Sequence, residues 1–274
     1  MKRFKNVIKS LWNIMNLQDV KVLPGQIAFF LMLSIFPLII LFGVIITKIS
    51  MPVDQLIDLF EEFLPKNIYE MLLPFLNGKG FDTNVGIFMI LGFIMASNGT
   101  DSIILASNRL YDFEDSDYIK RRIKAILLVI LIIVTLIFAM FFLAFGDYIV
   151  KFIFDILNMD NIKNIVYNIF VYLKWPISMF IIFFMLKLLY VISPDKKIMS
   201  KNTTRGAIFS TLGISIVTFL YSHFFIKFTN YDIFYGSLSN IVIMMMWIYF
   251  VSYIIVIGIA INVNDYKNKE LTSS

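Results

Sequence analysis

The chain of 274 residues contains no cysteine, one histidine and few charged residues. The absence of cysteine excludes a disulfide framework and a thiolate metal site, and it leaves the redox compartment open. Charged residues make up 16% of the chain, whereas soluble domains normally carry about a quarter. Hydrophobic residues make up 59%, and the mean hydropathy is +0.82. This balance excludes an ordinary soluble domain and indicates an integral membrane protein.

Long apolar segments predict an all-α, polytopic membrane helical bundle, because a helix needs about 20 residues to cross a bilayer. We expect six transmembrane helices in residues 25–262, with amphipathic helices lying on the membrane surface. Residues 1–24 are predicted to form a basic amphipathic segment, and residues 263–274 a loose polar tail. The six spans are expected at residues 25–49, 85–106, 125–145, 175–192, 206–226 and 239–261.

The distribution of positive charge predicts how the bundle lies in the membrane. Six spans place both termini on one side, and seventeen of the 24 Lys and Arg residues then fall on that side. The positive-inside rule therefore predicts a multi-pass protein of the cell (inner or plasma) membrane with both termini in the cytoplasm. This distribution explains the net charge of +5 without a nucleic acid, so membrane lipids are the expected partners. The sequence does not indicate an oligomeric state.

Residues 97–101, Ser-Asn-Gly-Thr-Asp, bring polar groups into the second expected span. An acid at membrane depth costs a few kcal/mol or more, so it normally faces protein or water. Either the helix is broken here and lines a wet cavity, or it ends at Ala96 and the stretch lies at the membrane surface. The predicted topology puts Asp101 in the inner half of the span, two turns before Arg109. A functional role and a packing or helix-breaking role both fit this position.

Other polar side chains suggest a route through the bundle, which a transporter would need. Hydroxyl residues recur every three or four positions on the span at 206–226, a pattern that suits a packing seam or a polar path. Arginines beyond the second span suit an anionic headgroup. The route candidates are Asn98, Asp101, Ser102, Ser34, Thr211, Ser215, Thr218 and Ser222. The headgroup-binding candidates are Arg109, Arg121 and Arg122.

The residues do not favour an enzyme. Metal-dependent RNA hydrolysis needs a cluster of His, Asp or Glu ligands. His223 is expected on the outer side, whereas the acids near the inner face, such as Asp112 and Asp115, lie beside basic residues in a short loop. No nucleophile–base pair stands out. We therefore expect no catalysis, no metal and no cofactor, and we reject a ribonuclease.

Motifs from residue 25 to 262 resemble the YihY/BrkB family of bacterial inner-membrane proteins. An alanine–aromatic–Ser-x-Phe-Pro pattern ends at Pro37, and an Asn-Arg-Leu-Tyr motif is followed by Lys-Arg-Arg at 120–122. The chain departs from the family at Ala260, where a glutamate is usual, and at residues 29–30, where a tyrosine is usual. The residues that carry the resemblance are Pro37, Asn108, Tyr111, Tyr235, Gly236, Ser237, Trp247, Gly258 and Asn262.

The resemblance implies a six-span protein of the cell envelope, from a family once assigned as a ribonuclease. It also implies one proposed activity, the transport of lipid or other amphiphilic cargo. Combined with the polar route, it favours a transporter or flippase of lipid or anionic amphiphiles. The alternative is a non-transporting envelope scaffold, or a modulator of lipid-handling machinery, in which the polar stretch is packed and dry.

Overall fold

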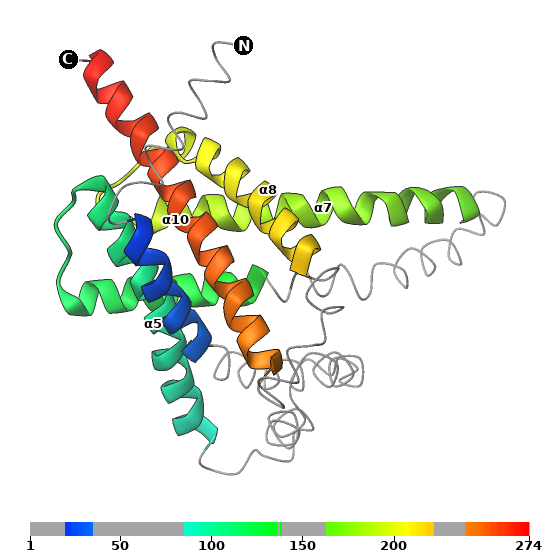
Figure 1. The fold of residues 1–274 in the computed structure, drawn as a ribbon, viewed down its shortest axis with the longest axis horizontal. Coiled ribbons are helices and arrows are strands. Elements are labelled where there is room, and N and C mark those ends of the chain that lie inside the picture. The colour runs from blue at the N-terminus through cyan, green and yellow to red at the C-terminus, as the bar shows by residue number, and fades with distance from the viewer. Residues whose placement is uncertain (1–19, 35–84, 136–137, 139–162, 222–238, 274) are drawn as a thin grey trace.

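The computed structural model describes residues 20–34, 85–135, 138, 163–221 and 239–273 (Figure 1). The first expected span is therefore described only as far as Ser34, and residues 1–19 of the basic segment lie outside the described part. The candidate residues that also lie outside it are Pro37, Ser222, Tyr235, Gly236 and Ser237.

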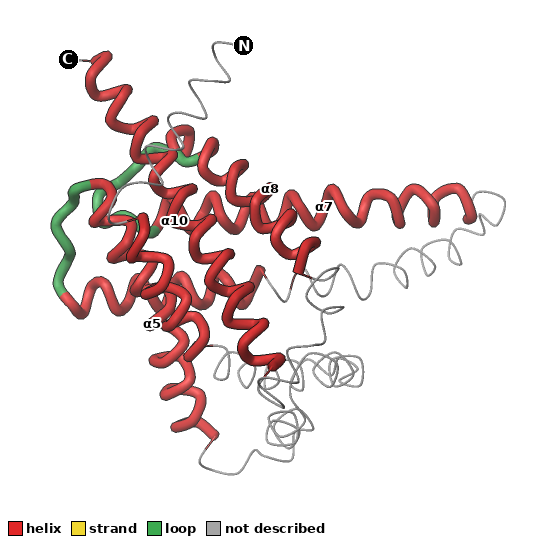
Figure 2. Tube along the Cα trace, in the orientation of Figure 1, coloured by secondary structure: helices red, strands yellow, loops and turns green. Residues whose placement is uncertain are grey.

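All secondary structure in the described residues is helical, which agrees with the predicted all-α class (Figure 2). A helix at Val20–Ser34 is the first element that the structure describes. It is followed along the chain by α5 (Val85–Tyr111), a helix of residues 118–135, α7 (Lys163–Ile192), the 3-10 turn η1 (Ser200–Asn202), α8 (Thr204–Leu220) and α10 (Ser239–Ser273).

Several helix boundaries differ from the predicted ones. The first described helix begins at Val20 rather than at residue 25, and the helix 118–135 begins seven residues before the expected span at 125–145. The helix α5 continues beyond residue 106 to Tyr111. The helix α7 begins twelve residues before the expected span at 175–192 and carries Pro176 in its interior. The helix α10 continues through the expected tail to Ser273, so a loose tail was the wrong expectation for residues 263–273. A hydropathy pattern marks only the lipid-facing part of a helix, and these helices extend beyond it.

One described helix is long and apolar enough to cross a membrane by itself, at Ile241–Lys267 within α10. Only 33% of its most apolar window is buried by the rest of the chain, unlike the core helix of a soluble protein. The apolar stretches Val20–Ser34, Pro176–Ile192 and Thr204–Leu220 are shorter. Large apolar side chains also lie more than half exposed on α7 and α8, as lipid-facing residues do. The six spans and the side of each terminus stay predictions.

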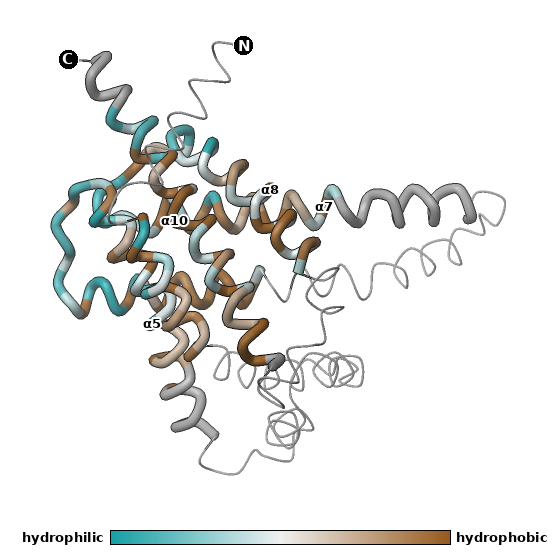
Figure 3. Tube along the Cα trace, in the orientation of Figure 1, coloured by the Kyte–Doolittle hydropathy of each residue, from teal (hydrophilic) through white to brown (hydrophobic). Residues whose placement is uncertain are grey.

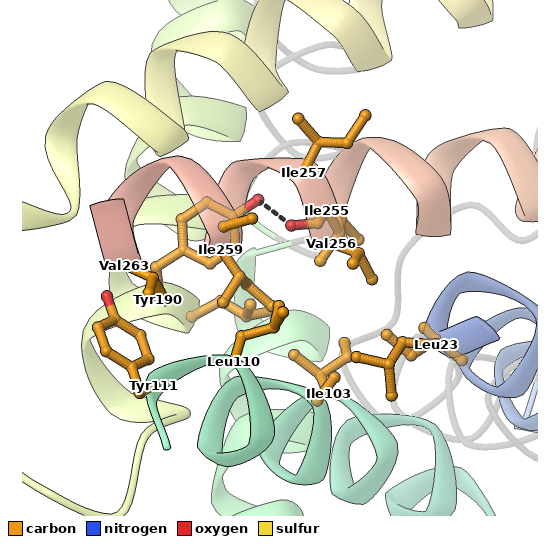
Figure 4. Close-up of a cluster of buried hydrophobic side chains, with 14 of the residues drawn as sticks. Leu23, Ile103, Leu110, Tyr111, Tyr190, Ile255, Val256, Ile257, Ile259 and Val263 are labelled. Atoms are coloured by element: carbon orange, nitrogen blue, oxygen red, sulfur yellow. Dashed lines mark hydrogen bonds between the residues drawn. The ribbon is translucent and has the colours of Figure 1, made fainter. Parts of the chain in front are cut away.

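The helix α10 holds the described helices together. It packs most extensively against α8 and also contacts α5, while α7 packs against α8. The buried cluster between them takes Leu110 from α5, Tyr190 from α7 and Ile259 from α10 (Figure 4). Because lipid tails are as apolar as these side chains, such a cluster stabilises a membrane bundle through close packing rather than through the hydrophobic effect.

Two helices approach closely at two glycines, where α8 crosses α10. A Cβ atom on Gly206 would collide with the carbonyl oxygen of Gly258, and one on Gly258 would collide with Ser210. The backbone N–H of Gly206 donates to Asn262 Oδ1 at 2.8 Å. Small residues permit this approach, and the amide then fixes the relative position of the two helices.

Polar residues gather at one end of the bundle. Figure 3 shows hydrophilic residues in the loop after α5, at the start of α8 and on α10 just before its grey C-terminal end. The loops 112–117 and 193–203, which are both predicted to be cytoplasmic, lie at this end (Figure 2). We refer to it as the basic end, because it carries Arg109, the residues 120–124 and Lys196.

Replacement of Gly206 by alanine tests the glycine crossing. We expect Gly206→Ala to destabilise the protein by about 3 kcal/mol, because the methyl group meets backbone that cannot move aside. Gly25→Ala is the matched control, since a Cβ there meets nothing within 4 Å and alanine favours the helix by about 1 kcal/mol. Thermal unfolding in detergent, followed by tryptophan fluorescence, measures both. Equal melting temperatures for the two variants would contradict the crossing.

Single cysteines test the predicted orientation without background labelling, because the chain has no cysteine. Glu114→Cys lies in the exposed loop at the basic end, and Asp160→Cys lies in a predicted outer loop. In sealed right-side-out vesicles, we expect an impermeant maleimide to label Asp160→Cys at once and Glu114→Cys only after permeabilisation. The opposite labelling pattern would reverse the topology.

Candidate functional site

The helix α5 passes through residues 97–101 without interruption, so both interpretations made from the sequence, a broken helix and an end at Ala96, are wrong. Ser97 Oγ donates to the carbonyl oxygen of Ile94 at 2.8 Å. Thr100 Oγ1 lies 3.1 Å from the carbonyl oxygen of Ser97 and 2.8 Å from that of Ala125, on the next helix. The hydroxyl groups are satisfied by backbone carbonyls, so the helix accommodates them without breaking.

Asp101 forms an ion pair with Arg121 of the helix 118–135. Arg121 Nε lies 2.8 Å from Asp101 Oδ1, and both side chains are 17% exposed. One position along, Arg122 Nη1 donates to Asn98 Oδ1 at 2.7 Å. The partner of Asp101 thus comes from the next helix and not from Arg109, with which the sequence aligned it. Two arginines dock this helix onto α5, and Arg121 neutralises the acid, which lowers the cost of its burial.

A second polar network joins three segments at the basic end. Asn108, near the end of α5, donates to Asp115 at 2.9 Å and to Asp195 at 2.6 Å, and it accepts from the backbone N–H of Asp195 at 2.9 Å. Lys124 Nζ lies 2.8 Å from the other carboxylate oxygen of Asp195, and the N–H of Ser116 also donates to this carboxylate. The loop between α7 and α8 is therefore bound both to α5 and to the helix 118–135.

This network changes the acidity of Asp195, whose side chain is 12% exposed. Burial acts to raise its pKa, but hydrogen bonds from Lys124, Ser116 and Asn108 outweigh burial. The pKa of the carboxyl group falls from 3.8 to about 2. The charged form of Asp195 is thus stabilised by the fold.

The end of α5 places Phe113 beside this network. Asp112 has φ 58°, in the left-handed region, and the N–H of Phe113 donates to the carbonyl oxygen of Asn108 at 2.9 Å. This pattern is a Schellman motif, which ends a helix and turns the chain sharply. The Phe113 ring then stacks on Tyr111 with ring centroids 5.2 Å apart, and Lys196 lies 5.0 Å from its centroid. The turn is tied to α10 by an ion pair between Asp112 and Lys267.

A cavity of about 350 Å³ opens next to Phe113, between the helix Val20–Ser34, α5 and the loop after it. Its volume lies in the range of small-molecule sites, about 300–1,000 Å³. Three apolar side chains, one amide, one cation and one acid line it: Leu23, Leu105, Phe113, Gln26, Arg109 and Asp115. Of the three headgroup-binding candidates, Arg109 lines this cavity. Arg121 and Arg122 lie on the helix 118–135 and bond to Asp101 and Asn98 of α5.

The other route candidates lie at helix contacts or bond to their own helix. Ser34 Oγ lies 2.6 Å from the carbonyl oxygen of Phe30 and 3.1 Å from that of Ala96, across on α5. Thr218 accepts from Trp247 Nε1 on α10 at 3.2 Å. Ser102 donates to Asn98 at 3.0 Å and Thr211 to Ala207 at 2.8 Å, each a carbonyl oxygen of the preceding turn. Ser215 is partly buried on α8.

The residues that carry the family resemblance also lie mostly at helix contacts. Trp247 and Asn262 bond to α8, and Gly258 lies at the crossing with that helix. Tyr111 is 3% exposed within the buried cluster, and Asn108 belongs to the Asp195 network. Ala260, where the family usually has glutamate, is buried in the same cluster. These motifs therefore describe how the helices fit together.

No part of the described residues resembles a hydrolytic metal site. Among them, no group of three His, Cys, Asp or Glu side chains is placed to hold a metal ion. The acids at the basic end, such as Asp101 and Asp195, are bonded to Arg121 and Lys124.

Sequence reasoning missed Asp195, Lys124, Asp115 and Gln26 as members of the site. The signal available for them was the predicted topology, which places the loops 112–117 and 193–203 on one side. Topology states which side a residue occupies but gives no pairing between loops, so Asp195 could not be matched to Asn108 from the sequence.

Asp195→Asn tests the loop network. The charged carboxylate contributes about 2 kcal/mol above pH 4, and this contribution is lost as pH falls toward the folded pKa near 2. We therefore expect Asp195→Asn to lower the melting temperature at pH 7 and to approach the wild type near pH 2.5. Asp117→Asn is the control, because Asp117 is 82% exposed and its partner Lys120 is 76% exposed. A pH-independent difference would contradict the network.

Comparison with known proteins confirms the family resemblance that the sequence motifs indicate. The sequence profile of the family described as virulence factor BrkB matches residues 11–273. The chain is also 26% identical over 268 residues to a putative ribonuclease-like protein YfkH of Bacillus subtilis (strain 168), covering 96% of each chain. No solved structure matches the chain. BrkB is not a known enzyme family, and its proteins are membrane proteins. Because the profile covers almost the whole sequence, this chain belongs to the BrkB family.

Proposed function

We propose that this membrane protein transports lipids or other anionic amphiphiles, and that the cavity at the basic end receives their headgroups. The observation that supports this most directly is the position of Arg109 in a cavity with apolar walls. A guanidinium binds phosphate through charge-assisted and often bidentate hydrogen bonds. The apolar wall residues, Leu23 and Leu105, suit the glycerol and upper acyl region of an amphiphile.

One face of α5 leads from this cavity into the apolar part of the bundle. Residues four positions apart on a helix lie above one another, so Arg109, Leu105 and Asp101 follow one side of α5, with Asn98 one turn further on. The cavity is lined by the first two of these residues. The next two are bonded to Arg121 and Arg122. A headgroup that moves along this face replaces the carboxylate of Asp101 as the partner of the Arg121 guanidinium.

The exposed apolar surface supports a cargo that shares the membrane with the protein. On α8, Ile216 is 59% and Phe219 is 57% exposed, and on α7 Phe180 is 65% exposed. Acyl chains could stay in contact with such surfaces while only the headgroup enters the cavity. A water-soluble cargo would need an enclosed polar path instead.

A scaffold without transport activity is the second candidate. It is favoured by the bonds that already hold Asp101 and Asn98 to the helix 118–135. In that case Arg121 and Arg122 serve only to dock one helix on another. The two candidates differ in whether lipid crosses a bilayer that contains the purified protein.

Reconstitution of the protein into liposomes tests the transport proposal. A fluorescent phospholipid in the inner leaflet becomes accessible to a membrane-impermeant quencher when it crosses, with and without an imposed proton gradient. We expect faster crossing with the wild type than in protein-free liposomes. Arg109→Gln should slow it roughly tenfold, the effect of one lost charge-assisted contact of about 1.5 kcal/mol. Asp101→Asn should also slow it, because the exchange partner of Arg121 is lost.

Lys120→Gln is the matched control. Lys120 is a cation at the same end, but its side chain is 76% exposed and pairs with Asp117 rather than lining the cavity. Its replacement should leave the rate unchanged. If the wild type moves no lipid under either condition, transport is wrong and the scaffold is favoured. If Arg109→Gln and Lys120→Gln slow the crossing equally, net charge and not the cavity is responsible.

A further inference from the structure

The cavity at the basic end contains charges of both signs. Arg109 at the end of α5 supplies a guanidinium, Asp115 in the following loop a carboxylate, and Gln26 of the helix Val20–Ser34 an amide. A site built for a purely anionic group would be weakened by the acid, because like charges repel. An acid in the lining instead favours a ligand with a cationic group of its own.

From this lining we propose that the cavity recognises a zwitterionic headgroup in which a phosphodiester and a primary ammonium group lie a few bonds apart. The phosphate binds Arg109, and the ammonium binds Asp115. This inference rests on the proposed function for its biological role, since it names the class of amphiphile that the same cavity receives. The chemistry is that of a phosphoethanolamine group, whether on a lipid or on a soluble glycerol phosphodiester.

The carboxylate of Asp115 can accept further hydrogen bonds, including one from an ammonium group. One of its oxygens, Oδ1, accepts from Asn108 Nδ2 at 2.9 Å, and an ionised carboxylate offers about four acceptor positions. Asp115 is exposed at the rim, so an ammonium group can reach it without deep burial. The bond from Asn108 orients the carboxylate before a ligand arrives. An oriented group loses less entropy when it binds.

The aromatic wall beside these charges is also held in place. Phe113 is stacked on Tyr111, and its ring meets the edge of Tyr266 on α10 with ring centroids 6.1 Å apart. Lys196 lies 5.0 Å from the Phe113 ring centroid and adds positive charge near the cavity. This additional cation supports the phosphate rather than the ammonium end of the ligand. A fixed wall with charges of both signs distinguishes a zwitterion from an anion of the same size.

Asp115→Asn tests the inference by direct binding. Purified protein in detergent is mixed with equal amounts of phosphatidylethanolamine and phosphatidylglycerol, and native mass spectrometry counts each bound lipid. The wild type should prefer the ethanolamine lipid. Asp115→Asn should reduce that preference about tenfold, because it removes the charge that binds ammonium but keeps an oxygen that accepts from Asn108. Arg109→Gln should lower the binding of both lipids.

Glu114→Gln is the matched control, because Glu114 is an exposed acid next in sequence that does not line the cavity. It should keep the wild-type preference. Equal binding of the two lipids by the wild type, or the same preference in Asp115→Asn and Glu114→Gln, would overturn the inference. Circular dichroism verifies that both variants are folded, and Asp115→Lys provides a second test that should favour the phosphatidylglycerol.

A soluble competitor separates the two sources of the headgroup. Glycerophosphoethanolamine should displace the bound ethanolamine lipid at millimolar concentration, while glycerophosphoglycerol should not. Binding of the soluble compound without any binding of the lipid would overturn a lipid ligand. Failure of the proposed function would give a different result. The protein would still prefer the ethanolamine lipid in detergent, but neither lipid would cross the reconstituted bilayer.

Discussion

The arrangement of this bundle depends on the ion pair between Asp101 and Arg121. A carboxylate in an apolar helix is tolerated only if a partner compensates for the water it has lost. The partner lies on the next helix, at 2.8 Å, and Arg122 adds a contact to Asn98 beside it. Their positions determine how the helix 118–135 crosses α5. The loop before that helix then carries Asp115 and Ser116 to Asn108 and Asp195.

The remaining helices follow a different physical rule. In lipid, apolar surfaces gain little by meeting each other, so small residues and a few polar bonds decide which helices approach closely. The crossing of α8 and α10 has both, with Gly206 and Gly258 in contact and Asn262 bonded across. On α7, the hydroxyl of Tyr190 lies 2.6 Å from that of Ser210 and 3.1 Å from the carbonyl oxygen of Ile255. Hydroxyl groups on α8 such as Ser210 therefore contribute to packing.

Much of this architecture follows from patterns in the sequence, but the pairings do not. Composition and apolar length predict helices of the right type, because each property depends on residues close together in the chain. The bond from Asp195 to Asn108 joins residues 87 positions apart, and no local pattern encodes it. The continuous helix through residues 97–101 was missed for a related reason. Its hydroxyl groups are satisfied partly by Ala125, which belongs to another helix.

A closed arrangement of Asp101 and Arg121 is compatible with the proposed transport. Separation of a mostly buried ion pair without replacement costs about 3–5 kcal/mol. A phosphate that takes the place of the carboxylate supplies Arg121 with a partner of similar strength. The carboxylate of Asp101 that it displaces then needs water or a cation of its own for the exchange to be cheap. In the proposed transport, the pair opens for a cargo that carries its own anion. In a scaffold the same pair would stay closed. The chemistry of the ligand therefore decides between a transporter and a scaffold. The charges that line the cavity, on Arg109 and Asp115, are the groups that recognise this ligand.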